Sequence, residues 1–243
     1  MKNEILIYCD EGSGEHSSKH LQKSLQIFFR DKYDVKLVDA NTILSRQWQS
    51  RCKIICFGGG YDKGYLNKLK REGCEMIRNF IENGGIYIGI CAGAYFACDY
   101  IEFDKNGPLE VVGERYLKFF KGIGYGPIFP GFEYNTSKGV HASCVYNANH
   151  MKLDKLDVFY KGGCAFRNCY NDDKTTILYK YALNDEAAII HTKIGDGQAL
   201  LSGVHYEYIP DDCNFEIEIK VRQKLNESNS SRLILLAELF ENL

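Results

Sequence analysis

One cysteine, Cys91, stands in a setting that suits a nucleophile. It lies at the centre of Gly89-Ile90-Cys91-Ala92-Gly93, which ends an apolar run and opens a helix-like stretch. A nucleophile on a tight strand-to-helix turn needs small residues two positions before and two after it, because the backbone there is crowded. The dipole and unpaired N–H groups of a helix amino terminus would favour a thiolate. The pattern predicts a nucleophile elbow; the alternative is a buried structural cysteine.

A second motif could supply hydrogen-bond donors for an oxyanion. Gly58-Gly59-Gly60 closes the preceding apolar run, KIICF, at the strand end where ligands bind in open α/β sheets. A backbone N–H of Gly59 or Gly60 could pair with that of Ala92, although an ordinary turn fits the same residues. The run lacks the Gly-Lys-Ser/Thr ending of a phosphate loop and the spacing of a dinucleotide fingerprint, so we expect no cofactor.

His205 and Glu207 form the best candidate for a base and its orienting group. Residues two apart in extended chain point to the same side, so Glu207 could bond one imidazole nitrogen while the other faces the cysteine. A solvated ion pair at a strand end is the alternative. The other histidines occur singly in polar, strand or loop contexts: His16, His20, His141, His150 and His191. The chain order of glycine loop, cysteine and histidine favours a Cys-His-Glu triad.

The elements that must position these residues can be read from the apolar runs. The first half alternates short apolar runs with helical patterns, which predicts a parallel sheet covered on both faces: EILIYC, DVKLVD, KIICFGGG and GIYIGICAG, with a Ser-capped helix in SSKHLQKSLQIFFRDK. From about Glu110, short strand candidates and Gly-rich turns predict added antiparallel strands. We expect one domain over residues 1–243, with a helical extension at about 211–243 that docks through NSSRLILLAELFENL.

Composition limits the partners and the compartment. The formal charge of -2 comes from 30 basic and 32 acidic residues that are interspersed, so neither nucleic acid nor an anionic membrane is an expected partner. No apolar stretch reaches the ~20 residues that span a bilayer, and we expect a cytoplasmic protein. The ten cysteines are dispersed and lack zinc-ligand spacing, so we predict mostly buried thiols and no metal site.

Together, these motifs resemble the class I glutamine amidotransferase-like superfamily. Within it, the chain is most similar to the amino-terminal domain of eukaryotic-type biotin–protein ligases, over about residues 4–209 and in four ordered segments: CFGGGYDKGY, IRNFIENGGIYIGICAGAYFAC, EVVGERYLKFFKGIGYGPIFPGFEYN and GQALLSGVHYEY. The resemblance implies a flavodoxin-like three-layer α/β/α core, with Cys91, His205 and Glu207 in the catalytic roles.

Further residues are candidates for the walls of a pocket. The segment from Tyr116 to Tyr134 is rich in aromatic, Gly and Pro residues, which can line a pocket or simply fill core and turns. The segment YKGGCAF resembles another family segment and could approach the elbow. The candidate pocket residues are Tyr61, Tyr125, Gly162 and Gly163, and Asp62 and Glu133 are weaker candidates for binding a substrate amine.

The resemblance implies an amidotransferase-like or amide-hydrolase-like activity through a thioester. The substrate would be a small amide, with a ligase-like or acceptor protein as a further partner. We find no GRGRRGR-like or KWPND-like segment, so biotin ligation by this chain alone is not expected. The alternative is a non-catalytic binding or regulatory module for a biotin–protein ligase-like or carboxylase partner.

Overall fold

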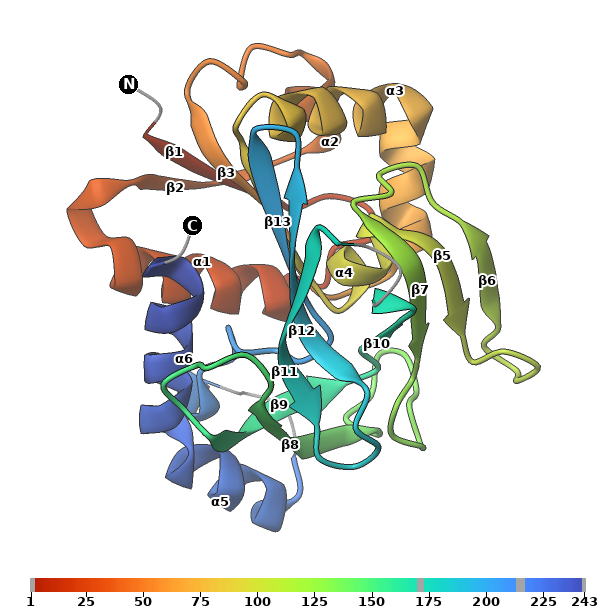
Figure 1. Cartoon of the computed structure of the whole chain (residues 1–243), viewed down its shortest axis with the longest axis vertical. Coiled ribbons are helices and arrows are strands. Elements are labelled where there is room, and N and C mark those ends of the chain that lie inside the picture. Colours follow the sequence, from red (N-terminus) through yellow and green to blue (C-terminus); the bar gives the residue numbers. More distant parts are fainter. Residues whose placement is uncertain (1–2, 170–172, 213–216, 242–243) are drawn as a thin grey trace.

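The apolar runs of the sequence form the strands of one mixed sheet (Figure 1). A computed structural model describes residues 3–169, 173–212 and 217–241, and the strands in these ranges all pair into that sheet. The strands are β1 (Glu4–Tyr8), β2 (Asp34–Val38), β3 (Cys52–Phe57), β4 (Ile86–Ile90), β5 (Cys98–Phe103), β6 (Val111–Glu114), β7 (Phe120–Gly126), β8 (Val140–Asn147), β9 (Lys155–Lys161), β10 (Ala165–Arg167), β11 (Thr175–Tyr181), β12 (Ala187–Ile194) and β13 (Gly197–Ser202).

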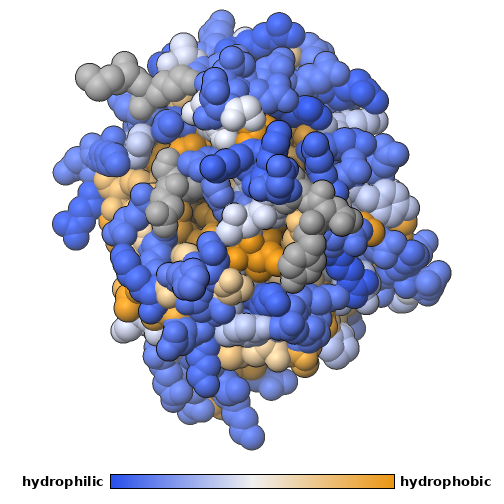
Figure 2. Space-filling model, viewed as in Figure 1, coloured by the Kyte–Doolittle hydropathy of each residue, from blue (hydrophilic) through white to orange (hydrophobic). Residues whose placement is uncertain are grey.

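Helices flank this sheet. They are α1 (Glu15–Phe29), α2 (Ala40–Leu44), α3 (Asp62–Glu82), α4 (Ala92–Ala97), α5 (Ile219–Glu227) and α6 (Asn229–Glu241). No helix in the ranges that the structure describes is long and apolar enough to cross a membrane. Most of the molecular face seen in Figure 2 is hydrophilic, with smaller apolar areas near its middle.

Five strands pair in parallel, in the order β2-β1-β3-β4-β13. This is the strand order of flavodoxin-like sheets, with β13 as the fifth strand. Strands β1 and β4 are buried at every position, as parallel strands under two helical layers must be, whereas the edge strand β2 is mostly exposed. The predicted flavodoxin-like core is therefore confirmed.

Alternate residues of β1 enter two separate cores, which defines the three layers. Ile5 and Ile7 pack in one cluster with Leu21 and Leu25 of α1. Tyr8 packs on the opposite face, where its ring lies 5.2 Å from that of Tyr65 in α3. Helices α1 and α6 accordingly lie on one side of the parallel strands, and α2 and α3 on the other (Figure 1). This alternation follows from the two-residue period of a strand.

The second half adds strands beyond β13, mostly in antiparallel pairs as predicted. Strands β13, β12, β10 and β7 follow one another antiparallel, and β11, β8 and β9 extend from β12. The exception is β5, which pairs with β7 in parallel. The chain runs back along β6, which pairs antiparallel with the other edge of β5, before it enters β7 in the direction of β5. The added strands place β9, and the loop that precedes β8, beside the carboxyl end of β4.

The carboxyl-terminal helix α6 docks on the α1 side of the sheet, as its apolar spacing predicted. Its buried residues include Leu235, Leu239 and Phe240, which join the cluster that contains Ile5. The ring of Phe240 lies 5.4 Å from that of Phe28 in α1. Parts of the predicted extension, residues 213–216 and 242–243, lie outside the described residues.

This docking predicts a large difference between two leucines of α6. Leu235 is fully buried and Leu233 is 48% exposed. Leu235→Ala removes buried methyl groups and leaves a cavity, so we expect a loss of about 2–5 kcal/mol in the free energy of unfolding, measured with urea. Leu233→Ala is the matched control and should change that energy by about 0.5 kcal/mol or less. Equal effects of the two substitutions would contradict the docking.

Candidate active site

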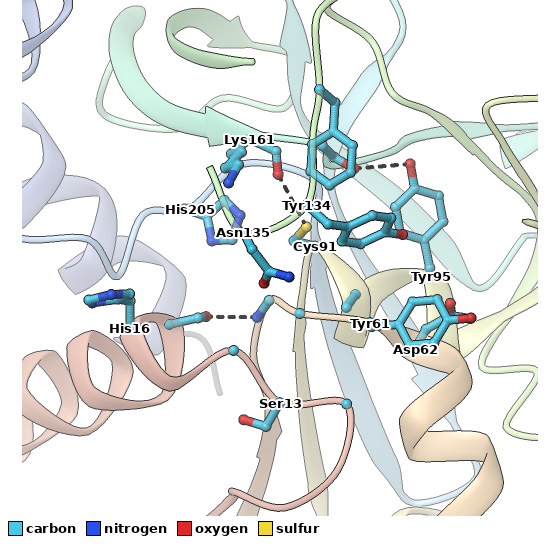
Figure 3. A pocket seen from close by; sticks show the side chains of 18 of the residues that line it. Ser13, His16, Tyr61, Asp62, Cys91, Tyr95, Tyr134, Asn135, Lys161 and His205 are labelled. Carbon is cyan, nitrogen blue, oxygen red and sulfur yellow. Dashed lines mark hydrogen bonds between the residues drawn. The ribbon is translucent and has the colours of Figure 1, made fainter. Parts of the chain in front are cut away.

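Four loops meet at the carboxyl edge of the parallel strands. β1, β3, β4 and β13 all run in the same direction, and the residues that follow them are Gly12–Ser17, Gly58–Gly60, Cys91 and His205. Because parallel strands present their carboxyl ends at one edge, residues far apart in the sequence converge there. A pocket of about 840 Å³ opens at this edge (Figure 3).

Cys91 occupies the strained turn that its flanking glycines predict. Its φ and ψ are 51° and -106°, between the end of β4 and the first residue of α4. A Cβ at Gly89 would lie 2.6 Å from the carbonyl oxygen of Gly93, and a Cβ at Gly93 would overlap the carbonyl of Phe57. A non-glycine residue at such a φ costs about 1–3 kcal/mol and persists only where its surroundings enforce it. The sulfur is thereby held at the pocket floor.

His205 and Glu207 form a buried hydrogen-bonded pair beside Cys91. Nδ1 of His205 lies 2.8 Å from Oε1 of Glu207, and both side chains are buried. The His205 backbone N–H donates to the carbonyl of Phe159 on β9 at 2.8 Å, which fixes the residue after the end of β13. With Nδ1 engaged, Nε2 is the ring nitrogen left for the pocket.

The charges around His205 favour its protonated form. Burial lowers the pKa of His205, but the carboxylate of Glu207 and the sulfur of Cys91 outweigh burial and raise the pKa from 6.5 to about 10. The imidazole of His205 is thus electrostatically coupled to both Glu207 and the sulfur of Cys91.

Ser17 links this pair to the glycine loop, a role that the sequence did not reveal. Its hydroxyl donates to Oε1 of Glu207 at 3.0 Å and accepts the Gly59 N–H at 2.7 Å. Ser24, two turns further along α1, donates to the backbone carbonyl of Glu207 at 2.8 Å. The predicted serine cap of this helix is wrong, because Gly14 occupies the cap position and Ser17 lies buried inside the helix. In the sequence, the feature that could have indicated this role is the pair Ser17 and Ser24, which lie seven residues apart and therefore on the same face of the helix.

The bond to Ser17 narrows the choice of oxyanion donors. The Gly59 N–H is engaged, so it is not the donor that the sequence suggested. Within the described ranges, neither the Gly60 N–H nor the Ala92 N–H has a protein acceptor. Both residues line the pocket next to Cys91. These two N–H groups are consequently the candidates for holding a negative oxygen.

Most of the residues that the sequence predicted for the site line the pocket, but Tyr125 and Gly163 do not. The wall includes Gly59, Gly60, Tyr61, Cys91, Ala92, Gly162 and His205. Glu207 lies behind His205. Tyr125 is not on the wall. Its neighbours Gly124 and Gly126 face Tyr95 and α4, so the side chain of Tyr125 points to the opposite face of the strand. There the Arg167 guanidinium lies 3.4 Å from the centre of the Tyr125 ring. Gly163 packs against the backbone of Gly203 instead.

The two acidic candidates for amine binding also have other partners. Glu133 is not on the wall and pairs with Lys138 at 2.7 Å. Asp62 lines the pocket, but its Oδ2 accepts the Nε of buried Arg115 at 2.5 Å. The charge of Asp62 is therefore compensated inside the protein.

Lys161 and the loop before β8 complete the wall; the segments that contain Lys161, Phe132 and Tyr134 were predicted candidates for it, but Lys161 itself was not. The Cys91 thiol donates to the Lys161 carbonyl at 3.5 Å. The Lys161 ammonium donates to the carbonyl of Thr136 and lies 5.7 Å from the ring centre of Phe132. In Figure 3, Lys161, His205 and Asn135 surround Cys91 on one side of the pocket. Lys161 thus contacts both Cys91, through its backbone carbonyl, and the loop before β8, through its ammonium group.

Ser17 provides a test of this network. Ser17→Ala leaves the buried Gly59 N–H without its acceptor and removes one donor to Glu207, so we expect a loss of about 1–3 kcal/mol in the free energy of unfolding. Ser50→Ala, at an exposed serine, should change that energy by about 0.5 kcal/mol or less in the same urea titration. If both variants unfold like the parent chain, the hydroxyl of Ser17 does not bridge the two groups.

The strand order and the convergence of loops at this edge define a flavodoxin-like α/β protein. The chain has a TM-score of 0.57 and 10% identity to a ThuA-like protein of Bacteroides uniformis, covering 98% of this chain and 90% of that one. It has a TM-score of 0.54 and 11% identity to a cytoplasmic protein of Salmonella typhimurium, covering 97% and 99%. Such likenesses show the fold alone.

The sequence comparisons identify the family. Residues 3–243 match the family described as biotin-protein ligase, N terminal, and the chain belongs to that family. It is 32% identical over 209 residues to the biotin–protein ligase of Schizosaccharomyces pombe, covering 84% of this chain and 33% of that protein. It is 31% identical over 234 residues to an uncharacterized protein of Chlamydia muridarum, covering 93% and 89%. The chain thus spans about a third of the length of the yeast ligase, and the predicted family resemblance is confirmed.

Proposed function

We propose that this chain transfers or hydrolyses the acyl group of an amide through a thioester on Cys91. The observation that carries the proposal is the tether of His205: its Nδ1 is bonded to buried Glu207, while its other nitrogen is left for a cysteine on a strained elbow. A base held in one orientation beside a cysteine is the arrangement that nucleophilic catalysis requires. Glu207, itself held by Ser17, would act as the orienting group.

The reaction would proceed in two halves. His205 takes the proton of Cys91, and the thiolate attacks the amide carbonyl while the N–H groups of Gly60 and Ala92 stabilise the oxyanion. The C–N bond then breaks as His205 gives its proton to the departing amine, which leaves an acyl thioester. Water, or an amine acceptor, releases the acyl group with His205 again as the base. Hydrolysis and transfer differ only in this acceptor.

The alternative is a module that binds a ligand or a ligase-like or carboxylase partner without turnover. The observation in its favour is the relation to part of the yeast biotin–protein ligase, since a domain carried in a larger protein can serve recognition. Both hypotheses predict an occupied pocket. They differ at the cysteine, because a binding module needs no activated thiol.

Competitive labelling of the cysteines separates these hypotheses. The native protein would be treated at neutral pH with less than one equivalent of iodoacetamide, and the labelled positions identified by peptide mass spectrometry. Cys9 is exposed and serves as the internal reference for an ordinary thiol, whereas Cys91 is buried at the pocket floor. Catalysis predicts that Cys91 is labelled first, despite its burial, because its thiolate is stabilised. Labelling of Cys9 ahead of Cys91 would overturn the proposal.

A further inference from the structure

The pocket around Cys91 has two chemically different sides. Figure 3 shows His205, Lys161 and Asn135 on one side of the sulfur, and Tyr134, Tyr95, Tyr61 and Asp62 on the other. The volume of about 840 Å³ lies within the ~300–1,000 Å³ of pockets that hold drug-sized ligands. The space therefore exceeds what the amide group alone needs, and the second side must receive the remainder of the substrate.

That second side is built from apolar and aromatic side chains. They come from α4, β5, β6 and the loop before β8: Tyr95, Ile101, Phe103, Val111, Phe132 and Tyr134. The aromatic rings contact one another, with centroids 5.4 Å apart for Phe103 and Phe132 and 4.8 Å apart for Phe132 and Tyr134. Such a wall binds flat or apolar groups through burial and ring contacts.

The carboxylates on the pocket wall are compensated by cations of the protein. Asp62 is paired with buried Arg115, and Glu15 with Lys19 at 2.6 Å. Free glutamine carries an ammonium and a carboxylate, and burying such charges against an apolar wall without matching partners is costly. A neutral group would not incur that cost.

Resting on the proposed thioester chemistry, we propose a substrate class for this site: an amide that carries an uncharged apolar or aromatic ring close to its carbonyl, rather than free glutamine. The amide lies over Cys91, with its oxygen toward Gly60 and Ala92. The ring occupies the apolar side and lies against Phe132 and Tyr134. His205 and Lys161 remain on the opposite side, where the acceptor enters.

Two electrophiles with the same reactive group test this assignment. N-benzylchloroacetamide carries a neutral ring, and Nε-chloroacetyl-lysine carries a zwitterionic tail. The rate constant for alkylation of Cys91 by each would be divided by the rate constant for glutathione, which removes intrinsic reactivity. We expect the benzyl reagent to be favoured at least about tenfold, which corresponds to ~1.4 kcal/mol. Equal rates, or a preference for the zwitterion, would overturn the assignment.

Variants locate the preference at the apolar side. Tyr134→Ala and Phe132→Ala should each lower the preference to about threefold or less, and Tyr134→Phe should retain it because the ring is kept. Tyr125→Ala is the matched control, since Tyr125 lies off the wall, and it should leave the preference unchanged. A preference that survives both Tyr134→Ala and Phe132→Ala in folded protein would contradict the assignment.

Unsubstituted chloroacetamide tests the proposed cysteine chemistry separately from the proposed substrate class. Rapid, His205-dependent alkylation of Cys91 by this small reagent without any preference between the tailed reagents would leave the proposed function standing and reject the substrate class. Failure of the small reagent to favour Cys91 would reject the proposed function, and the substrate class with it.

Discussion

Replacing His205 by alanine should slow the alkylation of Cys91 by iodoacetamide at neutral pH by a factor of about 100 or more. The buried imidazole is coupled to the sulfur and is oriented by Glu207 through a 2.8 Å bond, so its loss removes both the proton acceptor and the cation that favours a thiolate. A positioned base contributes about 10²–10⁴ to such reactions. The second-order rate constant at Cys91, followed by peptide mass spectrometry, is the measurement.

His191 supplies the matched control for this experiment. It lies on β12, and its Nε2 is 2.7 Å from Oε1 of Gln198, away from the pocket wall. His191→Ala should leave the rate at Cys91 within about twofold of the parent chain. If His205→Ala reacts as fast as the His191→Ala variant while both remain folded, His205 does not activate the cysteine.

Replacing Glu207 by glutamine should change how stability depends on pH. The pKa of His205 is raised from 6.5 to about 10, against the burial that lowers it, so the folded chain holds a proton that the unfolded chain releases. That stabilisation is fully present below about pH 6.5 and is lost as the pH rises to about 10. Each pKa unit corresponds to about 1.4 kcal/mol, so the wild-type chain should lose several kcal/mol across this window. Between pH 6 and pH 10, the free energy of unfolding of Glu207→Gln should fall by at least about 2 kcal/mol less than that of the wild-type chain. Urea unfolding at pH 6, 7, 8, 9 and 10 is the measurement.

The comparison isolates the pH-dependent part of the effect. Within the described residues, Oε2 of Glu207 has no hydrogen-bond partner, so the new amide group of glutamine is expected to cost stability at every pH. Titrating groups that do not interact with Glu207 or His205 contribute equally to both curves and cancel in the difference. Glu75→Gln, at an exposed position of α3, should give the wild-type slope. Parallel curves for Glu207→Gln and the wild type would contradict the assigned cause of the pKa shift.

Much of the fold follows from the sequence because its evidence is local. The runs EILIY, CKIICF and IYIGI are apolar at most positions on both faces, with Glu4 and Lys53 as the charged exceptions, and such runs indicate strands covered on both faces. Cys91 could be singled out because Gly89 and Gly93 meet a steric demand within five residues. His205 and Glu207 could be paired from their spacing of two residues, although the structure places them in a turn beyond β13 rather than in extended chain.

The parts of the site that the sequence did not predict depend on contacts between distant segments. Ser17 reaches Glu207 across 190 residues, and a serine near the start of a helix resembles a cap. Tyr125 was assigned to the pocket from aromatic content alone, without the pleat that turns Gly124 and Gly126 toward α4. Lys161 acts through its carbonyl, a group that every residue has and that no sequence pattern distinguishes.

Acylation by p-nitrophenyl acetate tests the thioester proposal most directly. The reagent gives its acetyl group to an activated nucleophile, and intact mass spectrometry, peptide mapping and hydroxylamine treatment report where and how it is attached. We expect one acetyl group per chain on Cys91, removed by hydroxylamine, absent in Cys91→Ala and formed much more slowly in His205→Ala. Acetylation that spreads over Cys9 and surface lysines, or that proceeds at the same rate without His205, would contradict the account.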